Sequence, residues 1–438
     1  MKVMIACGGT GGHLFPGLAV AETLLGRGHT VKLIVSERTV EREVLQMLPQ
    51  GAAAARLSLR SIAAIGLNGS AQALPFAYRF AQATAVCGAV CRAYQPQVVL
   101  GMGGYTAAPA VLAARGLRPR RTTTLIHESN AIPGKANRLA GRFAHHVALG
   151  LAECARFFEG KPVTLTGTPI RAQLRAGKCA DAHVRLGLRA DRATVLVMGG
   201  SQGAHPINEG IACALPWLAG WQDRVQFIHL SGAIDEGFVR EAYDGNGFTA
   251  RVLGFCHDMN LVYSAADLVL ARAGAATLAE IAAAGLPALL VPYPHAAGDH
   301  QAHNARVFQE AGAARVFCQR ELETNTHAER GERLATAISG LLDDPAECAA
   351  MRVAAQGLAC ADATDRIADL VEHCAQHRGS RAPIRGPVAA GLPGTASRGT
   401  QLSLRPPVSE GGAGRRLKPA ATGAAERAGG GTHIVEVP

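Results

Sequence analysis

Short apolar segments alternate with longer stretches rich in alanine and leucine along most of the chain. The short segments are almost free of polar residues, which is typical of strands buried on both faces of a parallel sheet. The stretches between them have the length of crossover helices, so the pattern predicts an α/β fold. The expected strands are Val3–Ala6, Val31–Val35, Val98–Leu100, Thr123–Ile126, Val147–Leu149, Val163–Thr166, Thr194–Met198, Val225–His229, Arg251–Leu253, Leu268–Ala271, Ala288–Val291 and Arg315–Phe317.

These strands fall into two sets that begin alike. Val3–Cys7 runs into a glycine turn at residues 8–12, and Val195–Met198 runs into a second glycine turn at Gly199–Gly203. A strand, a glycine turn and a helix therefore recur after about 190 residues, which predicts two doubly wound, Rossmann-like domains joined near Gly167–Arg175. Ligands of such sheets bind outside the carboxyl ends of the strands, so both turns are expected to face one cleft.

The expected domains are a Rossmann-like domain at 1–165, a second Rossmann-like domain at 166–360, a C-terminal helix at 361–379 and a tail at 380–438. The helix could pack back on the first domain. The tail holds eleven Gly, seven Pro and no aromatic residue, a composition that predicts disorder. An incidental flexible segment and a basic tether to a membrane or partner are both open for it.

The charge is distributed unevenly. The chain of 438 residues carries a formal net charge of +10, and residues 1–165 hold 18 basic and 7 acidic residues against 18 and 24 in residues 166–379. The first domain is therefore expected to face an anionic partner, either nucleic acid or a membrane surface. Aromatic residues are only 5% of the chain, which argues against a nucleic-acid platform.

Cysteine spacing and hydropathy limit the setting of the protein. The eleven cysteines form no CxxC pair, which favours reduced thiols in a cytoplasmic protein over a disulfide framework or a zinc site. No apolar stretch reaches about 18 residues, so we expect no transmembrane helix, and any membrane contact should be peripheral.

The first glycine turn predicts an anion site. The four glycines within residues 8–12 let backbone N–H groups approach a diphosphate. The helix that follows adds the positive end of its dipole. The dinucleotide fingerprint GxGxxG fails at Leu14, although Glu37 follows the second strand, so a dehydrogenase is weakened but stays open. His13 could accept a proton from an attacking hydroxyl, or it could cap or orient the loop.

Three further segments repeat this chemistry. Glycine turns at Gly101–Thr106 and Gly199–Ala204 each follow a strand. In Arg272–Glu280, small residues after Gly274 would let a phosphate reach the free N–H groups of a helix. Glu280 lies four residues after Ala276 on the same helix face, where a carboxylate could bind a ribose diol or simply be solvated.

The segment Asp299–Asn304 places amide side chains, which suit sugar hydroxyls, after a strand. His300 and His303 could bind a metal, but this is the weaker reading, and the chain contains no DxD motif for an acidic metal clamp. We therefore expect no metal or other cofactor.

A helical stretch from Leu74 to Arg92 carries Phe76 and Phe80 one turn apart, with Arg79 beside them. It could be an ordinary core helix or an apolar patch ringed by cations for a bilayer surface.

Five motifs in this order resemble the MurG family of N-acetylglucosaminyltransferases of bacterial peptidoglycan synthesis, over about residues 1–375. The motifs are Gly9–Pro16, Gly101–Tyr105, His127–Asn130, Gly199–Ala204 and Gly274–Glu280. The resemblance implies the two-domain GT-B glycosyltransferase fold. It implies UDP-N-acetylglucosamine as donor and the undecaprenyl-diphosphate-linked N-acetylmuramyl pentapeptide (lipid I) as acceptor. The muramyl 4-hydroxyl would attack with inversion to give lipid II.

The resemblance also implies that the domain at 1–165 faces the acceptor and the membrane and that the domain at 166–360 binds the UDP-sugar. It implies roles for individual residues as well. His13 is the candidate base or orienting residue. The residues expected at UDP-N-acetylglucosamine are Thr10, Gly11, Gly12, Asn130, Arg171, Ser201, Cys256, Ala275, Ala276, Thr277, Leu278, Ala279, Glu280, Gln301 and Asn304. The residues expected at the acceptor diphosphate are Gly9, Gly103, Gly104 and Tyr105. The expected membrane patch is Leu74, Phe76, Arg79 and Phe80.

The implied location is the cytoplasmic face of the bacterial plasma membrane, with peripheral attachment to its anionic surface and no nucleic-acid partner. Two alternatives stay open. One is a related GT-B glycosyltransferase with another lipid acceptor, and the other is a dinucleotide-binding oxidoreductase.

Overall fold

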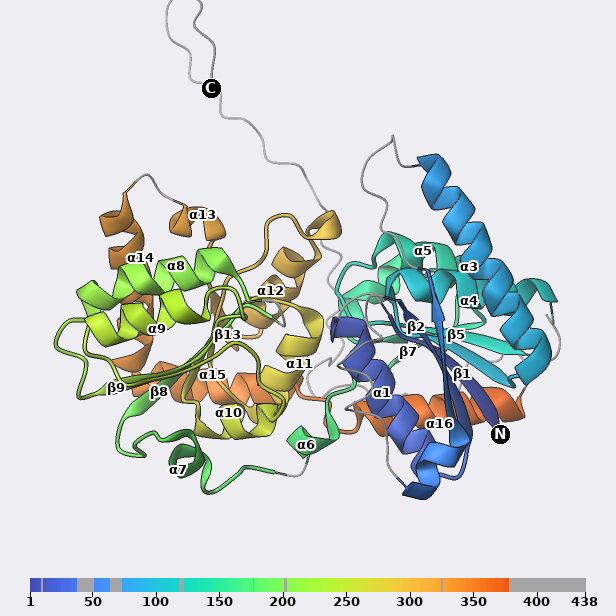
Figure 1. Cartoon of the computed structure of the whole chain (residues 1–438), viewed down its shortest axis with the longest axis horizontal. Helices are drawn as coiled ribbons and strands as arrows, with labels where there is room; N and C mark the ends of the chain where they lie inside the picture. The colour runs from blue at the N-terminus through green and yellow to red at the C-terminus, as the bar shows by residue number, and fades with distance from the viewer. Residues whose placement is uncertain are drawn as a thin grey trace, which may run out of the picture. The chain divides into compact units, whose positions relative to one another are not determined.

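The computed structural model contains two parallel β-sheets, each covered by helices on both faces (Figure 1). It describes residues 1–8, 11–37, 51–63, 73–117, 122–175, 177–200, 203–323 and 326–377. The predicted pair of doubly wound α/β domains is confirmed, and we call them the first and second lobes. The expected tail at 380–438 lies outside the described residues.

The first lobe holds a seven-stranded sheet in the order β3-β2-β1-β4-β5-β6-β7, with every pair parallel. Its strands are β1 (Lys2–Ala6), β2 (Thr30–Ser36), β3 (Leu57–Ile62), β4 (Val98–Gly101), β5 (Thr123–Glu128), β6 (His146–Leu149) and β7 (Val163–Leu165). Its helices are α1 (Gly11–Gly26), α3 (Ala73–Tyr94), α4 (Gly104–Leu117) and α5 (Lys135–Phe143), with 3-10 turns η1 (Gly51–Arg56) and η3 (Ala152–Phe157).

The second lobe holds a six-stranded parallel sheet in the order β10-β9-β8-β11-β12-β13. Its strands are β8 (Ala193–Met198), β9 (Val225–Leu230), β10 (Ala250–Leu253), β11 (Leu268–Ala271), β12 (Ala288–Leu290) and β13 (Ala314–Val316). The helices from the linker onward are α6 (Ala172–Arg175), α7 (Ala182–Leu186), α8 (His205–Ala214), α9 (Glu236–Gly245), α10 (Met259–Ala265), α11 (Ala275–Ala284), α12 (His300–Glu310), α13 (Gln319–Leu322), α14 (His327–Leu342), α15 (Pro345–Leu358) and α16 (Ala363–Gln376), with 3-10 turns η4 (Leu215–Leu218) and η5 (Ala297–Asp299).

All twelve strands expected from the apolar pattern are present, and the structure adds β3, which the pattern missed. β3 forms the edge of the first sheet and pairs only with β2. Most of its residues are partly exposed, and it contains Ser58, Arg60 and Ser61. An edge strand needs no continuous apolar run, because one side of it faces solvent.

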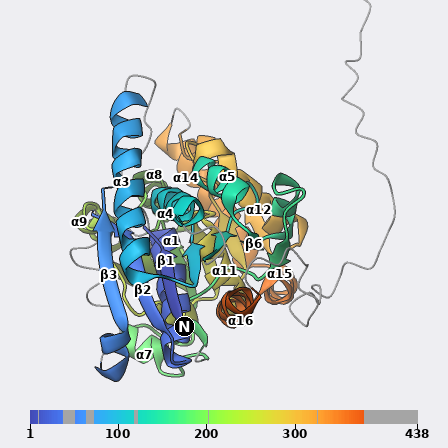
Figure 2. The same cartoon turned by 90° about the vertical axis from the view of Figure 1, so that its right-hand side faces the viewer.

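The last helix, α16, leaves the second lobe and packs on the first (Figures 1 and 2). Its buried face, which includes Ile367, Leu370 and Val371, joins the same apolar cluster as strand β1 and helix α1. On the surface of this contact, Arg27, the residue after α1, forms an ion pair with Asp369 at 2.6 Å. The two lobes are therefore connected twice, by the linker around residue 170 and by the segment that leads into α16.

In both sheets the strand order reverses direction at the strands that carry the glycine turns. In the first lobe this point lies between β1 and β4, and in the second between β8 and β11. Helix α1 approaches β1 closely, because a Cβ on Gly17 would lie 2.4 Å from the Cβ of Cys7. The topology thus places four strand ends, each followed by a glycine-containing segment, where doubly wound folds bind ligands.

Candidate functional site

A cavity of about 430 Å³ lies between the lobes and is lined by the segments that follow these strand ends. The first lobe contributes the start of α1 and the segment after β5. The second lobe contributes the turn after β8, the segment after β10, and the starts of α11 and α12. Its lining residues include Gly11, Gly12, His13, Phe15, Asn130, Arg171, Gly200, Cys256, Arg272, Ala275, Ala276, Thr277, Glu280, His300 and Gln301.

The first two glycine turns pack against each other at His13. Gly103 and Gly104 have φ angles of +97° and +71°, which favour glycine. A Cβ on Gly103 would lie 2.7 Å from Nδ1 of His13, and one on Gly104 would lie 2.3 Å from the Gly8 carbonyl oxygen. Glycine is therefore required at both positions for the imidazole to sit between the turns.

The hydrogen bond of His13 defines its tautomer. Nδ1 lies 3.2 Å from the carbonyl oxygen of Met102, which can only accept, so Nδ1 carries the hydrogen. Burial lowers the pKa of His13, and the nearby Glu128 carboxylate opposes this shift. The imidazole is therefore neutral at pH 7, with Nε2 as an unprotonated acceptor. This is the state that a general base requires.

Glu128, at the end of β5, organises the next segment. This carboxylate is 2% exposed and accepts from the backbone N–H and Nδ2 of Asn130, at 3.0 and 2.8 Å. It also accepts from the N–H of Gly134 and from Nδ2 of Asn137, at 3.2 and 2.9 Å. Because Glu128 receives Nδ2 of Asn130, the orientation of that carboxamide in the cavity is set.

Asn304 of α12 joins the lobes behind Asn130. Its Nδ2 donates to Oδ1 of Asn130 at 3.0 Å and to the carbonyl of Ala273 at 3.1 Å, and its Oδ1 accepts from the N–H of Ala131 at 2.9 Å. Asn304 is fully buried. Both hydrogens of its side-chain amide donate to protein acceptors. To donate to a sugar, Asn304 would have to break one of these hydrogen bonds.

Helix α11 presents open N–H groups to the cavity. Gly274 precedes the helix, and no side chain caps it. Ala275, Ala276 and Thr277 line the cavity, whereas the N–H of Leu278 donates to the Gly274 carbonyl at 2.9 Å. The first turn of α11 therefore forms an anion site.

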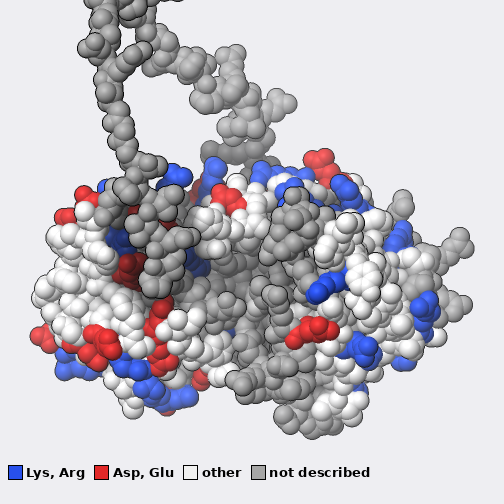
Figure 3. All heavy atoms as spheres, turned by 45° about the horizontal axis from the view of Figure 1, so that its top comes forward, with Lys and Arg blue, Asp and Glu red and all other residues white. Residues whose placement is uncertain are grey.

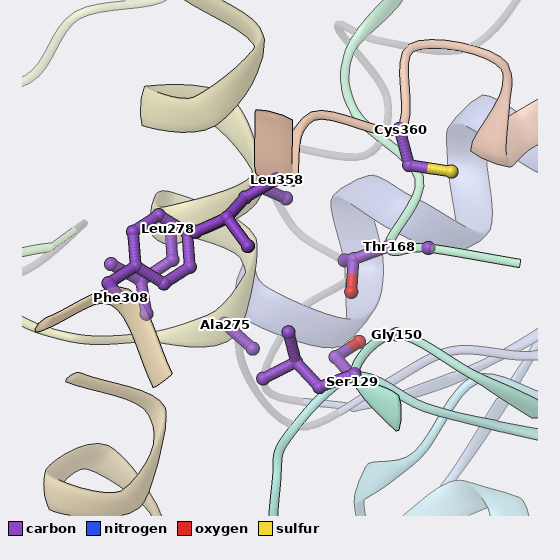
Figure 4. Close-up of a pocket in the computed structure, with 11 residues that line it drawn as sticks. Ser129, Gly150, Thr168, Ala275, Leu278, Phe308, Leu358 and Cys360 are labelled. Atoms are coloured by element: carbon purple, nitrogen blue, oxygen red, sulfur yellow. The ribbon is translucent and has the colours of Figure 1, made fainter. Parts of the chain in front are cut away.

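The motif at residues 275–280 divides between two cavities. Leu278 and Ala279, which we expected at the donor, instead line a separate cavity of about 40 Å³ behind α11 (Figure 4). In Figure 4, Leu278 and Phe308 face Thr168 and Cys360 across this space. A helix turns by about 100° per residue, so Leu278 points away from the face that Ala276 and Glu280 share.

Glu280 lines the main cavity and is held by two side chains. Its Oε1 lies 3.3 Å from Nε of Arg171, and its Oε2 accepts from the Tyr263 hydroxyl at 3.1 Å. Burial raises the pKa of Glu280, while Arg171 and the Tyr263 hydrogen bond oppose the rise. Arg171 in turn lies over the ring of Phe15 from α1, 4.1 Å from its centre. The predicted ribose-binding carboxylate and donor-site arginine thus form an ion pair within the cavity.

The remaining expected donor residues occupy different parts of the cavity. Gln301 lines it and accepts from the N–H of Tyr293 at 3.0 Å. Cys256 also lines it, and its thiol donates to the Asp258 carbonyl. Gly11 and Gly12 lie at its first-lobe wall. The predicted sites at Gly9, Thr10 and Ser201 lie outside the described residues.

Tyr105 lies against the aromatic residues of the expected membrane patch, and none of these residues lines the interlobe cavity. The ring of Tyr105 is 5.7 Å from that of Phe76 and 5.9 Å from that of Phe80. Leu74 is 84% exposed, and Arg79 is also exposed. The aromatic rings thus connect the Gly103–Gly104 turn to the exposed start of α3.

Sequence reasoning gave no role to three residues that shape the site: Glu128, Phe15 and Tyr263. Glu128 stood in the motif His127–Asn130, so that motif carried a signal. Phe15 and Tyr263 act through side-chain contacts with Arg171 and Glu280, and nothing in their local sequence indicates these partners.

The described residues lack two other kinds of feature. No group of three or more His, Cys, Asp or Glu side chains in these ranges is arranged to hold a metal ion. Among the helices described, none combines the length and apolar content needed to cross a bilayer.

Comparison with known proteins gives consistent matches to both lobes. Residues 3–149 match the glycosyltransferase family 28 N-terminal domain, and residues 194–367 match the family 28 C-terminal domain. A UDP-N-acetylglucosamine--N-acetylmuramyl-(pentapeptide) pyrophosphoryl-undecaprenol N-acetylglucosamine transferase from Geotalea uraniireducens is 39% identical over 381 residues, covering 84% of this chain and 97% of that protein. The protein of the same name from Geobacter sulfurreducens is 40% identical, with the same coverage.

Solved structures agree in fold. The crystal structure of Acinetobacter baumannii MurG has a TM-score of 0.64 and 29% identity, covering 85% of this chain and 99% of that one. A UDP-N-acetylglucosamine 2-epimerase from Listeria monocytogenes has a TM-score of 0.60 at 16% identity, a likeness that concerns the fold alone.

Proposed function

Since this chain belongs to glycosyltransferase family 28, among its MurG-type N-acetylglucosamine transferases, we propose that it transfers N-acetylglucosamine from UDP-N-acetylglucosamine to lipid I, giving lipid II. The chain is a glycosyltransferase, and the oxidoreductase alternative is set aside because both lobes match this family.

One observation carries the proposal: the interlobe cavity joins a neutral imidazole to an anion site. His13 contributes an unprotonated Nε2 from the first lobe, and the uncapped first turn of α11 faces the same cavity from the second. Glu280 lies one helical turn further along α11 and lines the same cavity. A sugar bound between them would meet a base on one side and a leaving-group site on the other.

The mechanism follows from this arrangement. Nε2 of His13 takes the proton of the acceptor's 4-hydroxyl as its oxygen bonds to C1 of the donor sugar. The bond from C1 to the β-phosphate oxygen breaks, and its electron pair stays with UDP. The N–H groups of Ala275, Ala276 and Thr277 stabilise the negative charge that develops on UDP. Attack opposite the leaving group inverts the anomeric centre.

We propose that this chemistry needs no metal, because main-chain amides and arginine supply the positive charge and the chain has no DxD motif. The deciding assay measures UDP release from UDP-N-acetylglucosamine with lipid I present and absent, and with a chelator added. We expect release that requires lipid I and persists with chelator. Loss of turnover with chelator would refute the metal-free mechanism. A panel containing diacylglycerol separates lipid I from other lipid acceptors, and faster turnover on another lipid would refute the acceptor assignment.

The first lobe also has a surface suited to an anionic membrane. Leu74 and Tyr78 of α3 are 84% and 72% exposed, and Phe143 of α5 is 39% exposed. The neighbouring helices α3, α4 and α5 carry no Asp or Glu, and their basic residues are Arg79, Arg92, Arg115, Lys135, Arg138 and Arg142. Basic side chains predominate over the right-hand part of the molecule in Figure 3. We propose that this face attaches the enzyme peripherally to the cytoplasmic side of the bacterial plasma membrane, where its acceptor is anchored.

A further inference from the structure

Arg272 stands out in the interlobe cavity because, among the described residues, no carboxylate forms an ion pair with its guanidinium. Apart from histidines, the charged side chains among the described lining residues are Arg171, Glu280 and Arg272. Glu280 and Arg171 form an ion pair. Within the described parts of the chain, no carboxylate forms an ion pair with Arg272, although this side chain is only 7% exposed. Glu323 acts on Arg272 through its electrostatic field but does not line the cavity, so the lining itself carries one positive charge that no ion pair neutralises.

The protein fixes one edge of the Arg272 guanidinium and leaves the rest free. Nη1 donates to the carbonyls of Val291 and Pro292, at 3.1 and 3.3 Å. The group lies over the ring of Tyr293, 5.4 Å from its centre. In the described ranges, no protein acceptor receives the N–H groups of Nε and Nη2. An oriented fork with free donors suits an oxyanion that accepts two hydrogen bonds.

The burial of this charge costs free energy. Burial lowers the pKa of Arg272, because water no longer fully solvates its charge, and the electrostatic effects of Tyr293 and Glu323 oppose the shift only in part. An arginine nevertheless stays protonated at neutral pH. A buried cation without a counter-ion is destabilising, so its presence here indicates a ligand that supplies the negative charge.

The position of Arg272 identifies the anion. It lies at the end of β11, three residues before Ala275, and its backbone N–H donates to Met198 at the end of β8. It thus lies between the ends of β8 and β11. The segments that follow these two strands line the second-lobe side of the cavity. We propose that Arg272 binds the diphosphate of the donor nucleotide and stabilises the charge on departing UDP, an inference that rests on the proposed transferase function. No proton moves in this step: the electron pair of the C1–O bond passes to the β-phosphate oxygen.

Calorimetric titration with uridine, UMP and UDP tests this assignment without the acceptor. For Arg272→Met we expect UDP to bind about tenfold to hundredfold more weakly, the range for a lost charge-assisted hydrogen bond, and uridine to bind within about twofold of wild type. Arg272→Lys keeps the charge but not the fork, so its loss should be intermediate. The control is Arg306→Met, since Arg306 is an exposed residue of α12, outside the cavity, paired with Glu310.

Steady-state kinetics distinguish the two diphosphates in the reaction. We expect Arg272→Met to lower kcat and raise the donor KM, with the KM for lipid I unchanged. A raised lipid I KM with intact UDP affinity would assign Arg272 to the acceptor and overturn the proposal. Equal losses for uridine and UDP would also overturn it, since they indicate a purely structural role. If wild-type protein failed to bind UDP, the proposed function itself would fail.

Discussion

Replacing Glu280 with glutamine tests the donor site most directly. The substitution keeps the size of the side chain and removes its charge. In the free protein the carboxylate accepts from Tyr263 and pairs with Arg171, whose Nε and Nη1 are buried and make no hydrogen bond. We expect Glu280→Gln to raise the donor KM, because the glutamine binds the ribose diol less strongly.

The size of this effect follows from the bonds at stake. A hydrogen bond to a charged group contributes about 1.5–3 kcal/mol, and the carboxylate could receive two from the ribose. Arg171 and Tyr263 already occupy Glu280 in the free protein, so part of this gain is spent on displacing them. We therefore expect the free energy of one such bond, which corresponds to a donor KM raised about tenfold to 150-fold.

The assay compares UDP-N-acetylglucosamine with its 2′-deoxyribose analogue for both proteins. Wild type should bind the 2′-deoxy analogue more weakly than UDP-N-acetylglucosamine. Glu280→Gln should bind the two donors with similar affinity, because its residue 280 already makes only a weak hydrogen bond to the 2′-hydroxyl. Thermal unfolding of both proteins checks that the variant folds. Equal discrimination against the deoxy donor by both proteins would refute the contact between Glu280 and the ribose.

Three further predictions concern the base, the core and the membrane face. Because burial lowers the pKa of His13, the neutral form persists to lower pH, so the acid limb of kcat/KM should fall below pH 6.5, and His13→Ala should abolish that limb and lower kcat. Leu370→Ala removes a side chain that is 1% exposed in the core of α16, so it should lower the free energy of unfolding by about 2–5 kcal/mol in denaturant titration. Leu74→Ser with Arg138→Glu should weaken sedimentation with anionic vesicles, and added salt should weaken wild-type binding.

Matched controls separate these effects from general damage. Val353 is 70% exposed, so Val353→Ala should change the free energy of unfolding by no more than about 0.5 kcal/mol. Ile234 is 94% exposed on the second lobe, so Ile234→Ser should leave vesicle binding unchanged. An acid limb at or above pH 6.5, a Leu370→Ala variant as stable as wild type, or vesicle binding insensitive to salt would each contradict the corresponding prediction.

Local patterns in the sequence were enough to predict twelve of the strands that the structure describes and the glycine turns that follow them. Runs such as Val98–Leu100 are apolar at every position because parallel strands are buried on both faces, and this signal is local. Glycine at 103 and 104 marked the second turn, whose positive φ angles the structure shows. The spacing from Ala276 to Glu280 placed both residues on one helix face, because the helical period is constant.

Which of these local features come into contact depends on the folding of the whole chain. Asn304 bonds to Asn130, 174 residues away, and the ion pair of Glu280 with Arg171 spans more than a hundred residues. That Arg272 has no ion-pair partner among the described carboxylates is likewise visible only in the folded structure. Side-chain pairing and burial depend on how the two sheets and α16 pack. Hydrophobic periodicity reports local secondary structure, so it does not indicate these long-range contacts.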